Sequence, residues 1–138
     1  MSVLKNKRKE SPMKVIALGD EIVAYTLRLL FNENVFPKKS RWLMSGKIAD
    51  LMNEFHKDLH KANDTYVVTP EDAKERHVLQ TRAYATLNAS ASVMRMAQLV
   101  LQFDVNRLEH WAGMCVEELR LLKAWQRNDD RRYSITKE

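Results

Sequence analysis

Apolar residues recur every three or four positions along the segment 39–63, and this spacing constrains the fold more than any other feature of the chain. The residues concerned are Ile48, Leu51, Met52, Phe55, Leu59 and Ala62. Residues spaced in this way share one face of an α-helix, so the pattern predicts an amphipathic helix with one buried side. A similar stripe over 15–32, with Val15, Ile22 and Leu29 seven residues apart, predicts an earlier helix.

Two later segments add helix start and stop signals to their apolar spacing. The run Thr-Pro-Glu-Asp at 69–72 combines a side-chain cap, a proline at the first helical position and acidic residues in the first turn. A third helix is therefore expected from this run to about residue 102. A short break at 103–106 precedes a fourth helix that should end near residue 127.

Few residues interrupt these patterns. Only three glycines and three prolines occur in 138 residues, too few for a loop-rich or many-turned β protein. Four helices with short connections predict an all-α fold, an up-down-up-down four-helix bundle over residues 15–127. Residues 1–14 offer almost nothing apolar and are expected to form a disordered basic arm, and residues 128–138 a flexible C-terminal tail.

The segment 91–101 is more apolar than one buried helix face requires. Eight of its eleven residues are apolar, and the polar exceptions fall within about 120° of a helical wheel. The surplus residues Val93, Met96 and Val100 predict a second buried face and therefore an oligomer interface between copies of the chain. The alternative is that a long central helix is simply well covered within one small bundle.

The positive charge of the chain is unevenly placed. The formal net charge is +5, of which residues 1–14 supply +4 and residues 15–127 only +1. Cations attract phosphate in a salt-sensitive way, so the basic residues of the folded segment are candidate nucleic-acid contacts. They are Lys38, Lys39, Arg41 and Lys47 near the start of the second helix, and Arg76, Arg82 and Arg95 on the third. The alternative for each is a solvated helix face, and Trp42 beside them is expected in the core rather than as a base-stacking platform.

No constellation in the sequence is typical of an enzyme. His56 and His60 stand four residues apart, a spacing at which two imidazoles can share a metal, but no third ligand is evident and solvated side chains are favoured. Cys115 lies on an apolar stripe, where a thiol is usually an inert small hydrophobe. The three glycines are too far apart for a phosphate loop, and no Glu-x-x-His pair of a di-iron bundle occurs. We therefore predict a non-enzymatic protein with no cofactor and no metal.

The sequence also predicts a cytoplasmic protein without a membrane partner. No apolar run approaches the roughly 18 residues that a transmembrane helix needs. The basic N-terminal residues are not followed by an apolar stretch and a cleavage site. The single cysteine cannot form an internal disulfide.

Two segments of the chain resemble a known family. The first is Phe36-Pro37-Lys38-Lys39-Ser40-Arg41-Trp42, followed by Ile48 and a long amphipathic helix that ends in Ala62-Asn63. It resembles a pattern of small four-helix-bundle proteins, namely those encoded in ribosomal-RNA intervening sequences and the accessory variability determinants of diversity-generating retroelements. The second segment, 101–125, is similar to the accessory subgroup, with Glu109-His110 in the opening turn of the last helix and Trp125 near its end.

The resemblance covers residues 15–127 and implies a function as well as a fold. It implies a homopentameric barrel or ring that binds the retroelement reverse transcriptase and its template RNA, with DNA as a further polyanionic partner, and supports mutagenic complementary-DNA synthesis. Lys38, Lys39 and Arg41 fall on the matched motif, whereas Arg82 and Arg95 are chosen from helix phase.

Two other classes of function remain open from the sequence. One is a protein-interaction adaptor, with the third helix docking a partner protein and no direct contact to nucleic acid. The other, which the sequence favours less, is a metal-dependent enzyme that uses His56 and His60.

Overall fold

The computed structural model describes residues 2–133, and every regular element in this range is helical. Its long helices are α1 (Ser2–Phe31), α2 (Gly46–Asp64), α3 (Pro70–Leu101) and α4 (Val105–Tyr133). A short 3-10 helix, η1 (Lys38–Ser40), and one turn of π-helix, η2 (Arg41–Ser45), connect α1 to α2. The predicted all-α class with four helices is confirmed for this range. None of the helices described within it is long and apolar enough to cross a lipid bilayer.

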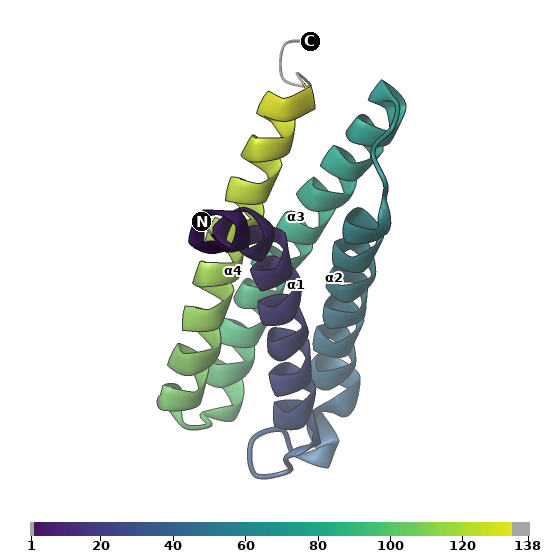
Figure 1. Ribbon diagram of the computed structural model, residues 1–138. Coiled ribbons are helices and arrows are strands. Elements are labelled where there is room, and N and C mark those ends of the chain that lie inside the picture. Colours follow the sequence, from purple (N-terminus) through teal and green to yellow (C-terminus); the bar gives the residue numbers. More distant parts are fainter. Residues whose placement is uncertain (1, 134–138) are drawn as a thin grey trace.

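The long helices lie side by side (Figure 1). The α1–α2 and α3–α4 connections meet at one end of the molecule, and the α2–α3 connection lies at the other end, toward the last turns of α4. Helix α2 packs on α1 and α3, and α4 packs on the same two helices from another side. Each long helix therefore has two neighbours, which lets its apolar stripe contribute to one shared core.

Large apolar side chains fill this core from all four helices. Fully buried examples are Ile22, Met52, Phe55, Leu59, Leu87, Met94, Trp111 and Leu122. The indole N–H of Trp111 donates to the hydroxyl of Thr26 at 2.7 Å, and that hydroxyl donates to the carbonyl of Ile22 at 2.6 Å. The polar edge of the largest core residue is thus satisfied inside the apolar interior.

The start of α3 agrees with the sequence signals. The Thr69 hydroxyl accepts from the backbone N–H of Asp72 at 3.1 Å, and the Asp72 carboxylate accepts from the N–H groups of Val68 and Thr69, both at 3.1 Å. This is a capping box, with Pro70 opening the helix. The donors of Val68 and then Thr69 hold the pKa of the Asp72 carboxyl below its usual value.

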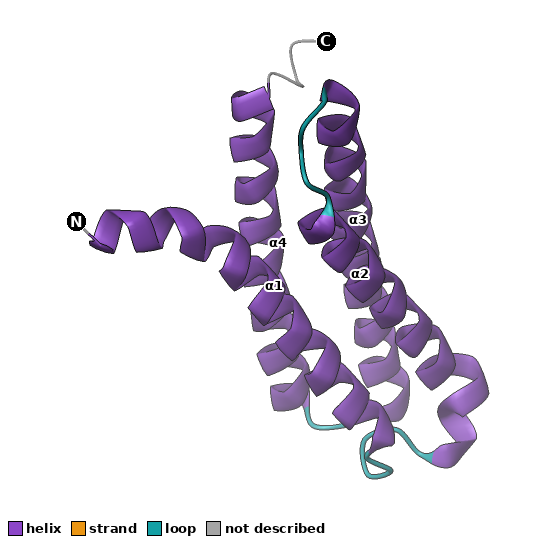
Figure 2. Cartoon of the chain, turned by 45° about the vertical axis from the view of Figure 1, so that its right-hand side comes forward, coloured by secondary structure: helices purple, strands orange, loops and turns teal. Residues whose placement is uncertain are grey.

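Both chain ends differ from the expectation. Residues 2–14 are predicted as a disordered arm, but their backbone belongs to α1. The first part of this helix bends away from the other helices (Figure 2). Pro12 falls in this part, and proline lacks the N–H that an inner helix turn requires, so it commonly kinks a helix. Helix α4 runs to Tyr133 instead of ending near residue 127, so the flexible tail predicted over 128–138 begins too early. Residues 134–138 of that tail lie outside the described part of the chain.

The hydrogen bond between Trp111 and Thr26 leads to a stability prediction. Thr26→Val keeps the side-chain shape but removes the acceptor, which leaves a buried indole N–H unsatisfied. We expect the free energy of unfolding to fall by about 1–3 kcal/mol, measured by urea denaturation. Thr86→Val, at a partly exposed position of α3, is the matched control and should change it by about 0.5 kcal/mol or less. Equal effects of the two substitutions would contradict the role of this hydrogen bond.

Candidate functional site

A turn rich in cations precedes α2. We call the residues Lys38, Lys39, Arg41, Trp42 and Lys47 the basic turn. It begins after Phe36, whose ring is buried and packs on Phe103 of the α3–α4 connection at a centroid distance of 5.5 Å. Both the backbone N–H and the hydroxyl of Ser40 donate to the carbonyl of Pro37, at 2.9 and 2.6 Å. The turn is thus fixed to the bundle by a buried ring on one side and a tight 3-10 turn on the other.

All members of the basic turn are exposed. Lys39, Arg41 and Lys47 project into solvent, and the Lys38 ammonium lies 3.7 Å from the exposed Glu33 carboxylate. Such an exposed pair contributes little and leaves the lysine available to other anions. Four cations thus lie within ten residues at one end of the molecule.

Trp42 corrects a prediction. It is expected in the core, yet 91% of its surface is exposed, and the next residue, Leu43, is 72% exposed. The apolar stripe of α2 begins at Ile48, six residues after Trp42 and about 120° away from it around a regular helix, so Trp42 does not belong to that stripe. Trp42 lies instead on the π turn that precedes α2. The indole of Trp42 is therefore exposed to solvent, next to the cations of the basic turn.

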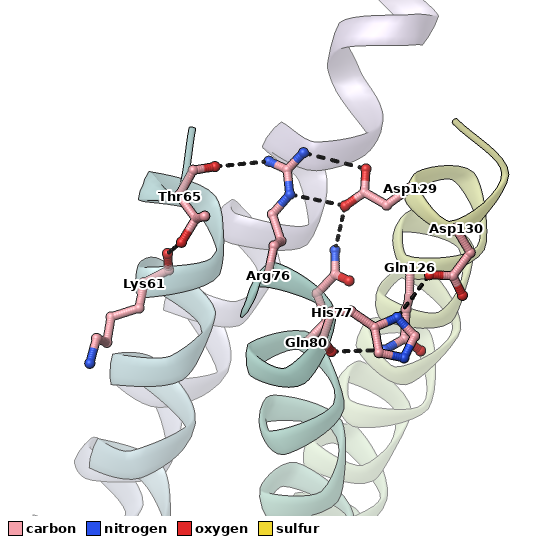
Figure 3. A network of polar contacts seen from close by, with 8 residues as sticks. All are labelled: Lys61, Thr65, Arg76, His77, Gln80, Gln126, Asp129 and Asp130. Atoms are coloured by element: carbon pink, nitrogen blue, oxygen red, sulfur yellow. Dashed lines mark hydrogen bonds and ion pairs between the residues drawn. The ribbon is translucent and has the colours of Figure 1, made fainter. Parts of the chain in front are cut away.

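Arg76 is the second correction, because its guanidinium is occupied inside the protein (Figure 3). Its Nε lies 3.0 Å from Oδ2 of Asp129, and its Nη1 donates to the backbone carbonyl of Thr65 at 3.4 Å. The guanidinium also lies 5.7 Å from the Trp125 ring centroid, and only 15% of the Arg76 side chain is exposed. Arg76 joins the end of α2 to α4 and is withdrawn from the candidate nucleic-acid contacts.

Further polar contacts surround this ion pair and fix the last turns of α4. Gln80 donates to Asp129 at 3.0 Å, and Nδ1 of His77 lies 2.8 Å from Oδ1 of Asp130. Gln126 donates to the Thr81 hydroxyl at 2.7 Å and to the His77 carbonyl at 3.1 Å. These partners stand 45 to 53 residues apart in the sequence. No local sequence pattern therefore indicates that Asp129 and Asp130, which fall in the expected tail, are buried.

The two remaining arginines of α3, Arg82 and Arg95, are exposed but do not form one surface. Thirteen residues separate them, which corresponds to about 20 Å along the helix and about 140° around it. Arg82 shares its face with Val93, Met96 and Val100, whereas Arg95 lies on a different side of α3.

The predicted oligomer-interface residues lie at the surface of the single chain. Met96 and Val100 are each 57% exposed, and Val93 is half-buried. Val78, 50% exposed, extends the same helix face toward the start of α3. We call Val78, Val93, Met96 and Val100 the α3 apolar face.

Asp20 on α1 is a neighbour of the two histidines that the sequence did not reveal. Its Oδ1 lies 2.7 Å from Nε2 of His60 and 3.3 Å from Nε2 of His56. The sequence separation of some 40 residues hides this proximity, and only packing of α1 on α2 brings the three side chains together.

A buried carboxyl lies close to this group. Glu118 of α4 is fully buried, and neither of its carboxyl oxygens has a hydrogen-bond partner among the residues that the structure describes. Burial, followed by the negative charges of Asp20 and Glu117, raises the pKa of Glu118 to about 8. Cys115, one turn earlier, is also buried, and burial together with Glu118 raises the pKa of its thiol to about 12. The thiol is thus protonated at neutral pH, as expected of an unreactive core cysteine.

Glu118 leads to a prediction of pH dependence. Its pKa is raised on folding from an ordinary value of 4.5 to about 8, so between these values the folded protein holds a proton that the unfolded chain releases. Stability should therefore fall as pH rises through this window, with a slope of up to about 1.4 kcal/mol per pH unit. Glu118→Gln cannot ionise, and we expect it to exceed the parent in stability at pH 8 by about 2 kcal/mol or more.

The measurement is urea denaturation of both proteins between pH 5 and pH 8 in the presence of a chelator. Glu109→Gln, at an exposed position of the same helix, is the matched control and should show the same pH dependence as the parent. A constant difference between the parent and Glu118→Gln across this range would contradict the prediction.

Residues 2–133 thus carry three distinct surface features: the basic turn, the α3 apolar face and the group formed by Asp20, His56 and His60. Comparison of the chain with protein-family models, with curated proteins and with solved structures found no match.

Proposed function

We propose that this protein is a non-enzymatic, nucleic-acid-binding accessory to a reverse transcriptase, of the kind that serves diversity-generating retroelements in the cytoplasm. The observation that carries the proposal is the basic turn, in which an exposed indole stands among four exposed cations. Three of these cations, Lys38, Lys39 and Arg41, belong to the segment that resembles the accessory family.

The chemistry of the basic turn suits single-stranded RNA. Lysine and arginine attract the phosphate backbone and release its counterions, which provides affinity without sequence preference. An exposed indole can stack on an unpaired base, because every base has a flat π face. The charge of residues 15–127 is only +1, so this local gathering, rather than net charge, is the physical basis for binding.

Self-association is the second part of the proposal. We propose that the chain folds as an up-down-up-down bundle and that copies assemble through the α3 apolar face into a ring, a pentamer by family resemblance. Apolar side chains such as Met96 and Val100 cost free energy while they remain in water, and a second copy of the same helix would cover them. A ring would also repeat the basic turn once per chain, so that a single RNA could engage several turns at once.

A second candidate function is supported by the exposed pair Trp42 and Leu43. Two adjacent large apolar side chains on a surface turn are suited to a pocket in a partner protein. In that case the protein is an adaptor that binds the reverse transcriptase or another protein and does not contact RNA. An adaptor would keep its partner protein when the charges of Lys39 and Arg41 are reversed.

The RNA-binding proposal predicts specific losses of affinity. The double substitution Lys39→Glu and Arg41→Glu should weaken binding of a fluorescent single-stranded RNA at least about tenfold and lower the salt slope by about two. Trp42→Ala should cost about 1–3 kcal/mol of binding free energy, because it removes the stacking surface. Fluorescence anisotropy over a range of salt concentrations measures both effects.

The matched control reverses two exposed cations elsewhere, Lys74 on α3 and Arg127 on α4. It changes the net charge by the same amount and should retain most of the affinity. Equal losses of RNA affinity in both double variants would mean that binding depends only on net charge and not on the basic turn. An RNA affinity that does not change with salt concentration would contradict contact with phosphate.

The oligomer proposal predicts a mass several times that of the 16.2 kDa chain. Size-exclusion chromatography with light scattering measures it. Met96→Glu together with Val100→Glu should dissociate the assembly, because two carboxylates would have to be buried. Val116→Glu, at an exposed position of α4 (66% exposed), is the control and should leave the mass unchanged. A parent protein that is monomeric at micromolar concentration would contradict the ring.

A further inference from the structure

Three potential metal ligands converge between α1 and α2. Nε2 of His56 and Nε2 of His60 both approach the same oxygen of Asp20, at 3.3 and 2.7 Å. The two imidazole rings are 4.3 Å apart between centroids, as expected for side chains one helical turn apart. All three ligand atoms lie within 4.8 Å of one another.

The packing of α1 explains why Asp20 reaches the histidines. The preceding residue, Gly19, is buried and faces the side chains of Leu59 and Glu118. A Cβ atom at this position would collide with Leu59 and would lie 2.9 Å from a carboxyl oxygen of Glu118. Glycine thus lets α1 approach α2 and α4 without displacing these two side chains, and the close approach brings the next side chain, Asp20, to His56 and His60.

The spacing of the Asp20 oxygen from each histidine nitrogen is close to that of two ligands on one small metal ion. Zinc binds imidazole nitrogen and carboxylate oxygen at about 2.0–2.2 Å, so two ligands of a tetrahedral site lie about 3.3 Å apart. The separation of Asp20 from His56 already has this value, and that from His60 is a few tenths of an ångström shorter. Rotation of exposed side chains about their χ angles is enough to supply such a difference.

We propose that Asp20, His56 and His60 form a binding site for a divalent transition-metal ion of the Zn²⁺ class. The site has three protein ligands and leaves a fourth position for water, because Asp20 and His56 are each 47% exposed and His60 is 33% exposed. Two imidazoles and one carboxylate favour zinc, cobalt or nickel over magnesium and calcium, which prefer sites built from oxygen alone.

The ligands come from two helices, with Asp20 on α1 and both histidines on α2. A bound ion would connect α1 to α2 directly and so stabilise the bundle, whether or not the protein binds RNA.

Isothermal titration of the full, untagged, chelator-treated chain with ZnCl₂ tests the proposal. We expect saturable binding with one ion per chain that excess Mg²⁺ does not displace. Asp20→Asn, His56→Gln and His60→Gln should each weaken Zn²⁺ binding at least about tenfold. His110→Gln removes a histidine of α4 that packs on Tyr25, outside the site, and should bind Zn²⁺ as the parent does.

His56→Gln is the most informative variant. It keeps the shorter contact between Asp20 and His60, so a merely structural hydrogen bond would survive while metal affinity falls. Thermal unfolding monitored by circular dichroism verifies its fold, and Zn²⁺ should raise the melting temperature of the parent more than that of this variant.

Co²⁺ provides an independent measurement, since four-coordinate Co²⁺ absorbs visible light. The parent and His110→Gln should develop this absorption, and a variant lacking both His56 and His60 should not. An absence of saturable Zn²⁺ binding, or equal binding by the parent and the double variant, would overturn the proposal and leave only a hydrogen-bonded contact between the helices.

Discussion

The packing of Phe36 on Phe103 is the contact on which the candidate interface depends. It joins the α1–α2 connection to the α3–α4 connection, so both are held at one end of the bundle. The ring of Phe36 is buried, and the 3-10 and π turns that follow it reverse the chain over a short distance. The cations that come next are all exposed. A buried aromatic pair thus determines where positive charge and an indole are displayed.

At the opposite end of the molecule, polar contacts hold the connection between helices in place. Arg76 and Asp129 are both largely buried, and removing an ion pair from water costs free energy that its mutual attraction only partly offsets. Hydrogen bonds from Gln80 to Asp129 and from Arg76 to the Thr65 carbonyl offset more of that cost. Such a network positions the α2–α3 connection and the last turns of α4 against each other. Charged side chains are therefore buried and paired with one another at one end of the molecule, whereas those of the basic turn at the other end are exposed to solvent.

The sequence predicts a helix well where the signal comes from residues that are close together in the chain. The capping box at Thr69 and the apolar stripe of α2 depend on residues a few positions apart, and the structure agrees with both. The prediction for Trp42 is wrong because this residue lies on the π turn before α2 and not on the apolar stripe that begins at Ile48. Asp129 and Asp20 escape sequence reasoning for another reason: their partners lie about 40 to 53 residues away, and only tertiary packing brings them together. The candidate cations of the basic turn can be found from sequence, whereas the role of Arg76 cannot.

The central claim is that the basic turn contacts RNA through Trp42. The chain has three tryptophans, of which Trp111 and Trp125 are buried. Fluorine NMR of protein labelled with 5-fluorotryptophan therefore reports on the surface indole separately from the two core indoles. On addition of single-stranded RNA, the Trp42 resonance should shift or broaden strongly while the Trp111 and Trp125 resonances stay close to their original positions. An unchanged Trp42 resonance at RNA concentrations that saturate binding would contradict the account.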